Sequence, residues 1–181
     1  MPELGRDAPV LIAASFQARE RQRVTPNPET LRTDCTVMIV FSVFYIEATV
    51  DAIAQKMHMR SQMDAFLNPK RDKHYHPGLR HKLGWFYNEF VAVDKATTKN
   101  QLFKREHHLT RKLQRKFPGY ASLYKFRNDV SHGAIGAVAD SFADAKELRE
   151  QAKDIRSKLY SIARRYDPSV NPDTTYHEAI A

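Results

Sequence analysis

The segment KFRNDVSHG, residues 125–133, contains an arginine, an asparagine and a histidine that could act together on a phosphate group. Histidine has a pKa near neutrality in water, so it can give or take a proton unaided. The planar guanidinium of arginine donates hydrogen bonds to phosphate oxygens and stabilises the charge that develops on them. Arg127, Asn128 and His132 are therefore candidates for acid–base chemistry at a phosphate ester. The alternative is a solvated polar end of a helix.

A helix over 121–132 must position these side chains. At about 100° per residue it places Leu123, Phe126 and Val130 on one apolar face. Arg127 falls about 40° from Leu123, at the margin of that face, where an arginine is partly desolvated and needs an anionic or hydrogen-bonding partner.

The asparagine and the histidine share a second face of this helix, because they are four residues apart. His132 lies in the last turn, where the helix dipole stabilises a protonated imidazole. Gly133 follows as the expected C′ glycine that ends the helix.

The rest of the chain also predicts helices and no strands. TPNPET is a start signal, with Asn27 as N-cap and Pro28 at the first helical position. Ser141 is a second N-cap, with Asp144 in the first turn. We expect one all-α domain, an up-down bundle of about five to six helices. The expected ranges are about 8–22, 28–59 with a short extension at 61–67, 78–92, 100–116, 121–132 and 141–166.

The apolar run CTVMIVFSVFYIEATV, residues 35–50, is apolar nearly all round and predicts the central helix of the bundle. Glu47 interrupts the run, and a carboxylate there is costly unless it is paired. Asp51, four residues on, shares its face. Glu47 either supports Arg127, or both acids point outward through a narrow polar strip.

A basic loop between residues 69 and 82 also contains His74, His76 and His81. Their H-x-H-x₄-H spacing is not a specific zinc pattern and no cysteine or clear acidic ligand joins them, so no metal site is expected. The loop is either an RNA-contacting surface or a plain solvated loop. Its candidate RNA-binding residues are Lys70, Arg71, Lys73 and Arg80.

A second basic run follows at 104–116, and its members Arg111 and Arg115 are further candidates for phosphate contacts without base specificity. A solvated helix face is the alternative. Tyr75, Trp85 and Tyr87 could stack on bases, although core packing is favoured for Trp85.

The composition favours a polyanionic partner, because the formal net charge is +8 and the pI is about 9.6. Cys35 is the only cysteine, so no internal disulfide can form, and a small buried side chain in a reducing cytosol is expected. The start MPELGRDAPVL does not resemble a signal peptide, and run 35–50 is shorter than the roughly 20 residues of a membrane span. We find no phosphate-binding or dinucleotide fingerprint and expect no cofactor.

The spacing of Arg127, Asn128 and His132 near the end of a late helix, followed by Gly133, resembles the signature of the HEPN domain family. The segment FSVFYIEATVDAIAQ is similar to the second helix of several HEPN families, with a carboxylate in an apolar run. The resemblance covers roughly residues 30–166. It leaves 1–25 as an N-terminal helical extension and 167–181 as a loose tail.

The resemblance implies a small all-α homodimer that cleaves RNA without a metal. His132 would be the general acid or base, and Arg127 would stabilise the phosphate and the transition state. Asn128 would orient His132 or contact the phosphate, with Glu47 and Ser131 in supporting roles. The implied setting is cytoplasmic, as a toxin or defence effector with a neutralising antitoxin protein. The alternative is a non-catalytic HEPN-like module for nucleotide or RNA binding or for dimerisation.

Overall fold

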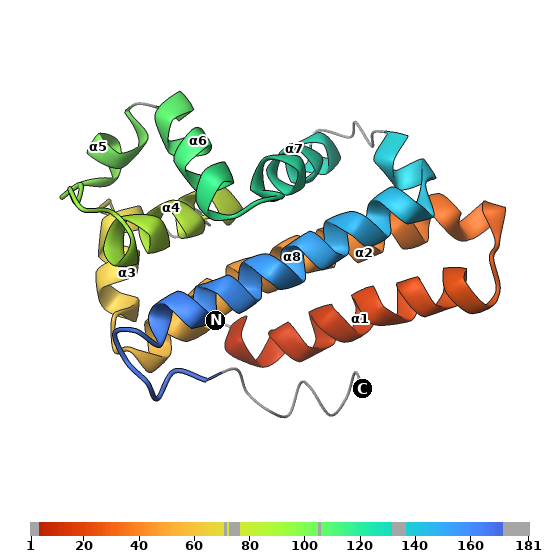
Figure 1. The fold of residues 1–181 in the computed structure, drawn as a ribbon, viewed down its shortest axis with the longest axis horizontal. Helices are drawn as coiled ribbons and strands as arrows, with labels where there is room; N and C mark the ends of the chain where they lie inside the picture. Colours follow the sequence, from red (N-terminus) through yellow and green to blue (C-terminus); the bar gives the residue numbers. More distant parts are fainter. Residues whose placement is uncertain (1–3, 71, 73–76, 105, 132–136, 172–181) are drawn as a thin grey trace.

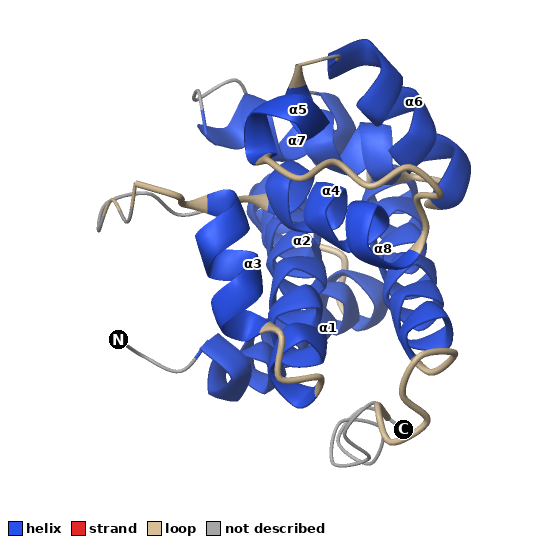
Figure 2. Ribbon diagram, turned by 90° about the vertical axis from the view of Figure 1, so that its left-hand side faces the viewer, coloured by secondary structure: helices blue, strands red, loops and turns tan. Residues whose placement is uncertain are grey.

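The computed structural model describes residues 4–70, 72, 77–104, 106–131 and 137–171, and all regular structure in these ranges is helical (Figures 1 and 2). The expected all-α class is confirmed. The helices of the described residues are α1 (Leu4–Val24), α2 (Pro28–Lys56), α3 (Arg60–Leu67), α4 (Leu79–Phe90), α5 (Lys99–Phe103), α6 (Glu106–Lys116), α7 (Tyr120–Ser131), the 3-10 turn η1 (Ala137–Asp140) and α8 (Phe142–Ala163).

Eight α-helices are described where five to six were expected, because two predicted helices are interrupted. The long helix ends at Lys56 instead of about 59. His58 then adopts a left-handed backbone with φ 56°, and the chain turns into α3. The segment expected as one helix over 100–116 forms α5 and α6. The break between them lets side chains of both helices, Phe103 and Leu109, pack against Gly84 of α4.

The expected helix start signals are confirmed. Asn27 is the N-cap of α2, and its side chain accepts a hydrogen bond of 2.9 Å from the Glu29 backbone N–H. Ser141 caps α8 in the same way, accepting from the backbone N–H of Asp144 at 3.2 Å. Such a cap contributes about 1 kcal/mol to helix stability.

Helix α2 is the central helix, as its apolar run predicts. It contacts α1, α4, α7 and α8, and Figure 1 shows it running beside α8 along the long axis of the molecule. Its residues Ile39, Val43, Ile46, Val50 and Ile53 are completely buried. Each such side chain stabilises the fold by roughly 1.5–3 kcal/mol relative to leaving it exposed.

The single cysteine has the structural role expected for it. Cys35 is buried on α2. Burial raises the pKa of its thiol to about 11, and the negative charges of Asp34 and Asp140 add to the shift. The thiol therefore stays protonated at neutral pH and is not a nucleophile.

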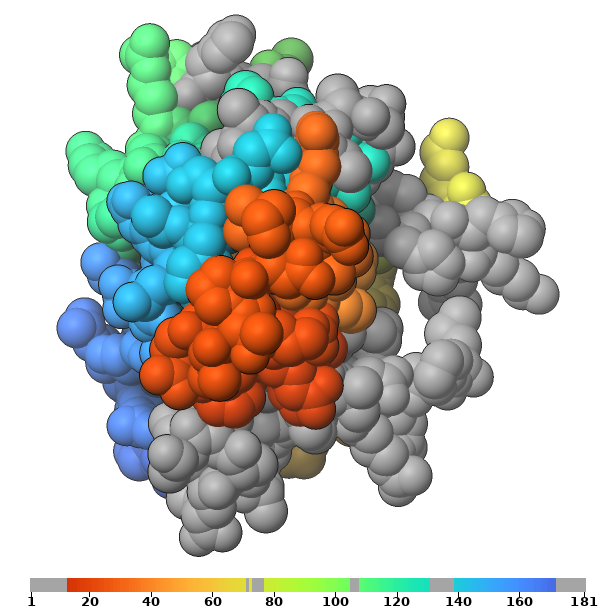
Figure 3. All heavy atoms as spheres, turned by 90° about the vertical axis from the view of Figure 1, so that its right-hand side faces the viewer, coloured from red at the N-terminus to blue at the C-terminus, as the bar shows by residue number. Residues whose placement is uncertain are grey.

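The N-terminal helix packs on the bundle through buried polar groups as well as apolar ones. Ser15 donates to the Met38 carbonyl at 3.1 Å, and the guanidinium of Arg149 from α8 reaches the Ser15 hydroxyl at 3.2 Å. Gln22 donates to Asp34 at 2.8 Å. Figure 3 shows α1 and the beginning of α8 as one continuous face. The segment expected as an extension is thus part of the packed structure.

The segment after α8 begins against the bundle, where a loose tail was expected from Asp167. Val170 is completely buried, and the carbonyl of Asn171 accepts a 2.9 Å hydrogen bond from the Lys56 ammonium. The buried Val170 side chain and these backbone contacts hold the segment against the bundle. The rest of the tail lies outside the described residues.

Candidate active site

Arg127 lies at the margin of the buried face of α7, as the helix geometry predicts. Leu123 and Phe126 are buried in the core, and Arg127 and Asn128 are half-buried beside them. Ser131 is the last residue of α7, and nothing is described of its side chain. His132, the predicted acid or base, lies outside the described residues.

The guanidinium of Arg127 is directed at the start of α4. A Cβ atom placed on Gly78, the N-cap of α4, would lie 2.9 Å from Arg127 Nη2 and 3.6 Å from Glu47 Oε1. The arginine of α7 and the carboxylate of α2 therefore meet at one glycine. Gly78 has φ −86°, so it is needed here for close approach and not for its backbone conformation.

Glu47 is half-buried, and one of its two carboxylate oxygens is enclosed by the protein. Its Oε1 is shielded from solvent and has no hydrogen-bond partner among the described residues. Burial raises the pKa of Glu47, and the charges of Lys82 and Arg127 and a hydrogen bond from the Leu79 backbone N–H offset part of the shift. Glu47 thus combines two roles, as a neighbour of Arg127 and as an acceptor at the N-terminus of α4.

The alternative in which both acids of α2 point outward is wrong. Asp51 is 3% exposed and forms a 2.7 Å ion pair with Lys82 of α4, which is also buried. Arg60 of α3 lies 3.2 Å from the second oxygen of Asp51. The two acids are directed at neighbouring helices, so the polar strip predicted on α2 is an internal contact surface.

A histidine and two further cations gather beside Arg127, and the sequence alone did not single out this group. The pKa of His81 is lowered to about 4, first by burial and then by the positive charges of Lys99, Arg80 and Arg127. The His81 ring packs on the Phe103 ring with 4.9 Å between centroids. The Arg80 guanidinium lies 5.2 Å from the centroid of the Phe103 ring. At pH 7 the His81 imidazole is therefore uncharged, and it adds no positive charge to this group.

Only some of the predicted site residues come together. Arg127, Glu47 and Arg80 surround the start of α4. Lys70 is exposed in the turn after α3, which Asn68 closes through hydrogen bonds with the Asp72 backbone at 2.7 and 3.0 Å. Arg111 and Arg115 are exposed on α6. Arg71 and Lys73 lie outside the described residues.

Sequence reasoning missed three residues of this site: Gly78, His81 as a buried neutral ring beside Arg127, and Lys99. The HPG sequence before α4 was a usable signal for Gly78, because a glycine at a helix start can admit a neighbouring side chain. No local pattern links Lys99 to Arg127.

The described residues contain no group of three or more His, Cys, Asp or Glu side chains that could hold a metal ion. His74 and His76 lie outside that part of the chain, and His81 packs on Phe103. The group that does assemble is cationic, with one buried carboxylate. Its chemistry is suited to an anion.

Helix α2 is the only helix in the described ranges that is long and apolar enough to cross a membrane. The whole helix reaches the required length, although the run 35–50 alone does not. In this structure 67% of its most apolar window is buried inside the molecule. A core helix of a globular fold meets the same criterion.

Comparisons with protein-family models, with curated proteins and with solved structures found no match to this chain. The site geometry therefore carries the functional argument.

Proposed function

We propose that this chain is a metal-independent endoribonuclease of HEPN type that acts in the cytoplasm as a homodimer. One observation carries the proposal: the Arg127 guanidinium of α7 lies against Gly78 at the start of α4, and Arg80 and Lys99 are near enough to join it in lowering the pKa of His81 there. Three cations from three helices at one place favour a phosphate diester as ligand. The formal charge of +8 would attract RNA to the surface.

The reaction follows from these residues. The ribose 2′-oxygen attacks phosphorus, its proton passes to a base, the bond from phosphorus to the 5′-oxygen breaks, and an acid protonates that oxygen. His132 takes the acid–base role that the HEPN resemblance implies, and Arg127 holds the non-bridging oxygens. Asn128 orients His132 or contacts the phosphate. The products are a 2′,3′-cyclic phosphate and a 5′-hydroxyl.

Glu47 and Gly78 would control where the guanidinium of Arg127 sits. The carboxylate attracts it, and the absence of a side chain on Gly78 leaves it room. Ser131 would be a minor contact. The RNA path would continue over Lys70, Arg71, Lys73 and Arg80 and over the exposed arginines of α6, Arg111 and Arg115.

By the same resemblance, the biological role would be a toxin or defence effector, with an antitoxin protein as inhibitor. A second function is favoured by a different observation. Because the Glu47 carboxylate already lies beside Arg127, the arginine could serve stability alone. The chain would then be a non-catalytic HEPN-like module that binds nucleotide or RNA or forms a dimer.

The deciding experiment is cleavage of labelled total RNA and tRNA in EDTA. We expect the wild type to cut and His132→Ala and Arg127→Ala to lose at least roughly 100-fold in rate. Arg165→Ala and His58→Asn are matched controls on exposed residues elsewhere, and asparagine tolerates the left-handed backbone of position 58. An inactive wild type, or variants as active as the controls, would leave the non-catalytic module as the answer.

Gly78→Ala tests the geometry of the arginine without removing it. The new methyl group would lie 2.9 Å from Arg127 Nη2, at the flexible end of that side chain. We expect a loss of about 1 kcal/mol of stability, as for an alanine at an N-cap, but a roughly 10- to 100-fold slower cleavage because the guanidinium is displaced. Pro77→Ala is the neighbouring control. Cleavage by Gly78→Ala at the wild-type rate would contradict the assigned position of Arg127.

A further inference from the structure

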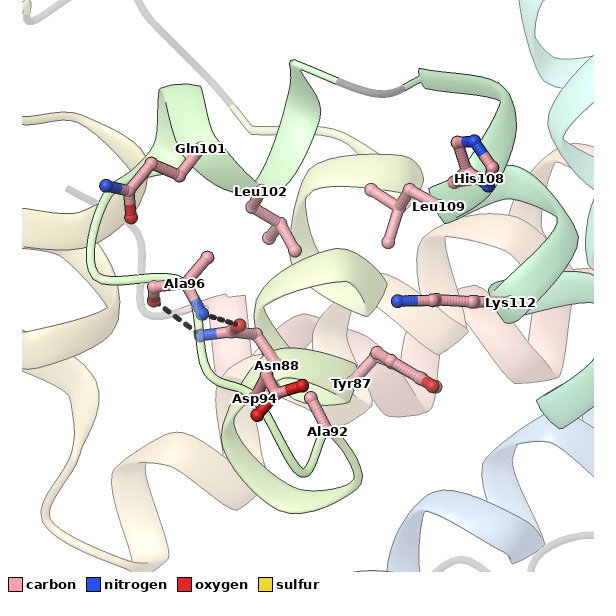
Figure 4. A pocket seen from close by; sticks show the side chains of 10 residues that line it. All are labelled: Tyr87, Asn88, Ala92, Asp94, Ala96, Gln101, Leu102, His108, Leu109 and Lys112. Carbon is pink, nitrogen blue, oxygen red and sulfur yellow. Dashed lines mark hydrogen bonds between the residues drawn. The ribbon is translucent and has the colours of Figure 1, made fainter.

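A second site lies toward the other end of α4. A pocket of about 220 Å³ opens between the C-terminal half of α4, the following loop, α5 and α6 (Figure 4). This volume is below that of typical drug-sized sites, about 300–1,000 Å³, and suits a single small ring system. The lining residues are labelled in Figure 4, and those that matter here are Tyr87, Asn88, Asp94, Leu102, Leu109 and Lys112.

The pocket is held open by the protein itself. Asn88 is 4% exposed, and its side chain accepts from the Ala96 backbone N–H at 2.7 Å and donates to the Ala96 carbonyl at 3.0 Å. These two bonds, drawn in Figure 4, fix the loop that carries Asp94. A preformed pocket binds its ligand without the entropic cost of ordering a loop.

Two opposite charges line the pocket without neutralising each other. Asp94 and Lys112 form no ion pair with one another or with any other residue in the described ranges. Figure 4 shows the Lys112 side chain extending into the space from α6, with Asp94 on the loop. Both side chains are exposed at the pocket mouth, and a ligand that presents hydrogen-bond donors to the carboxylate and an acceptor to the ammonium would pair with both.

The other walls are suited to a flat ring. Leu102 and Leu109 supply apolar surface from α5 and α6, and Tyr87 supplies an aromatic ring from α4. The Gln101 side-chain oxygen accepts from the Thr97 backbone N–H at 3.0 Å and so helps to fix the start of α5 at the edge of the pocket. Planar apolar contact with polar groups at the rim is how proteins hold an unstacked base.

We propose that this pocket binds a guanine base of a single-stranded RNA. Guanine carries two adjacent donors, N1–H and N2–H, which match the two oxygens of Asp94. Its neighbouring acceptor O6 matches Lys112. Adenine and cytosine each present one donor group beside an acceptor on this edge, and uracil presents one donor between two acceptors. Each of these three bases can give one hydrogen bond to the carboxylate and accept one from the ammonium, but only guanine pairs with both oxygens of Asp94 and with Lys112 at once.

This inference rests on the proposed function for the choice of RNA, but it concerns binding and not cleavage. Helix α6 carries both the pocket residue Lys112 and the exposed cations Arg111 and Arg115. A strand whose phosphates contact these arginines would place a base at the pocket mouth. The pocket would then set a guanine preference near the cut, which a phosphate site alone cannot do.

The test is binding of 2′-O-methyl pentanucleotides UUNUU to the full chain, with G, A, C or U at the central position. These oligonucleotides have no 2′-hydroxyl and cannot be cleaved, so the result does not depend on catalysis. We expect the G oligonucleotide to bind about 5- to 100-fold more tightly than the other three, as for a good bidentate base contact. Guanosine monophosphate should compete with it.

Three variants separate the pocket from the rest of the surface. Asp94→Asn should remove the guanine preference and leave the other three affinities unchanged, because one carboxylate oxygen becomes a donor facing N–H groups. Leu102→Trp should fill the pocket and have the same effect. Asp154→Asn, an exposed acid of α8, is the matched control and should change nothing.

Equal affinity for the four oligonucleotides, or a guanine preference that survives Asp94→Asn, would overturn this inference. Failure to bind any of them would overturn it as well. A guanine preference in a chain that cuts no RNA would keep the pocket and reject the nuclease. Cleavage of RNA without any guanine preference in binding would keep the nuclease and reject the guanine pocket.

Discussion

The approach of the Glu47 carboxylate and the Arg127 guanidinium to the same glycine, Gly78, is the main feature at the scale of single residues. Glu47 lies on an apolar helix, and the groups near it are Arg127, Lys82 and the first backbone N–H of α4. These partners stabilise its ionised form, but burial outweighs them, so the pKa of Glu47 is raised. The carboxylate is therefore held in place at a cost in stability, as is common at functional sites.

This cost gives a defined pH dependence. Because the folded state holds the Glu47 proton more tightly than the unfolded state, stability is highest below the unfolded pKa of about 4.5 and falls as the pH rises through the raised folded value. Glu47→Gln cannot ionise, so it does not lose stability as the pH rises. We expect Glu47→Gln to become more stable relative to the wild type as the pH rises from 4 to 8. Its free energy of unfolding should increase relative to that of the wild type.

Denaturant unfolding at several pH values measures this difference. Glu147→Gln, which removes an exposed carboxylate on α8, serves as the control for the loss of one negative charge. If Glu47→Gln instead loses stability relative to the wild type as the pH rises, its pairing with Arg127 and Lys82 outweighs burial. The electrostatics assigned to the site would then be wrong.

The position of α4 against α2 decides the site at the scale of elements. Gly78, His81 and Lys82 all lie in or beside the first turn of α4, and each contacts or acts on a residue of another helix. The buried ion pair of Lys82 with Asp51 fixes the rotation of α4 about its own axis. That rotation places Gly78 next to the Arg127 guanidinium.

Breaking the ion pair from one side should be severe. Asp51→Ala leaves the Lys82 ammonium, 8% exposed, without its partner at 2.7 Å. We expect a loss of about 3–5 kcal/mol in the free energy of unfolding, measured by urea denaturation. The double variant Asp51→Leu with Lys82→Met should recover most of this loss, because no unpaired charge remains.

Asp64→Ala is the matched control at this scale. Asp64 pairs at 3.1 Å with Arg60, which also contacts Asp51. The Asp64 side chain, however, is 53% exposed. Exposed pairs contribute only about 0–1 kcal/mol, so this variant should be nearly neutral. If Asp51→Ala costs no more than Asp64→Ala, the buried pair does not hold α4.

The distribution of charge is the decisive property of the whole molecule. The chain carries a net charge of +8, and much of the exposed positive charge of α6 lacks acidic neighbours on the same helix. On α8, by contrast, acids and bases alternate and pair, as in Lys153 with Glu150. A polyanion should therefore contact the α6 side of the molecule.

Salt dependence of RNA binding checks this expectation. Each phosphate of a single strand that is neutralised adds about 0.7 to the slope of log affinity against log salt concentration. The triple variant Lys104→Gln, Arg111→Gln, Arg115→Gln should reduce that slope by about 2 and weaken binding of all sequences equally. The control Lys146→Gln, Lys158→Gln, Arg165→Gln has the same net charge. An equal loss in both variants would show that only total charge matters.

The sequence by itself determined the helical class, the central place of α2, the caps Asn27 and Ser141 and the buried state of Cys35 and Trp85. These features follow from local patterns: apolar periodicity, capping residues and unbroken apolar runs act within one element. The place of Arg127 at the margin of its buried face also follows, because helix geometry alone sets it.

Only the tertiary structure decided what Arg127 meets. Glu47, Gly78, His81 and Lys99 come from distant parts of the chain, and no repeat distance relates them to α7. The breaks that separate α3 and α5 from their neighbours, and the pocket between Asp94 and Lys112, depend on the same packing. Local preference acts on one helix at a time, whereas these sites exist only where several helices exclude water from one place.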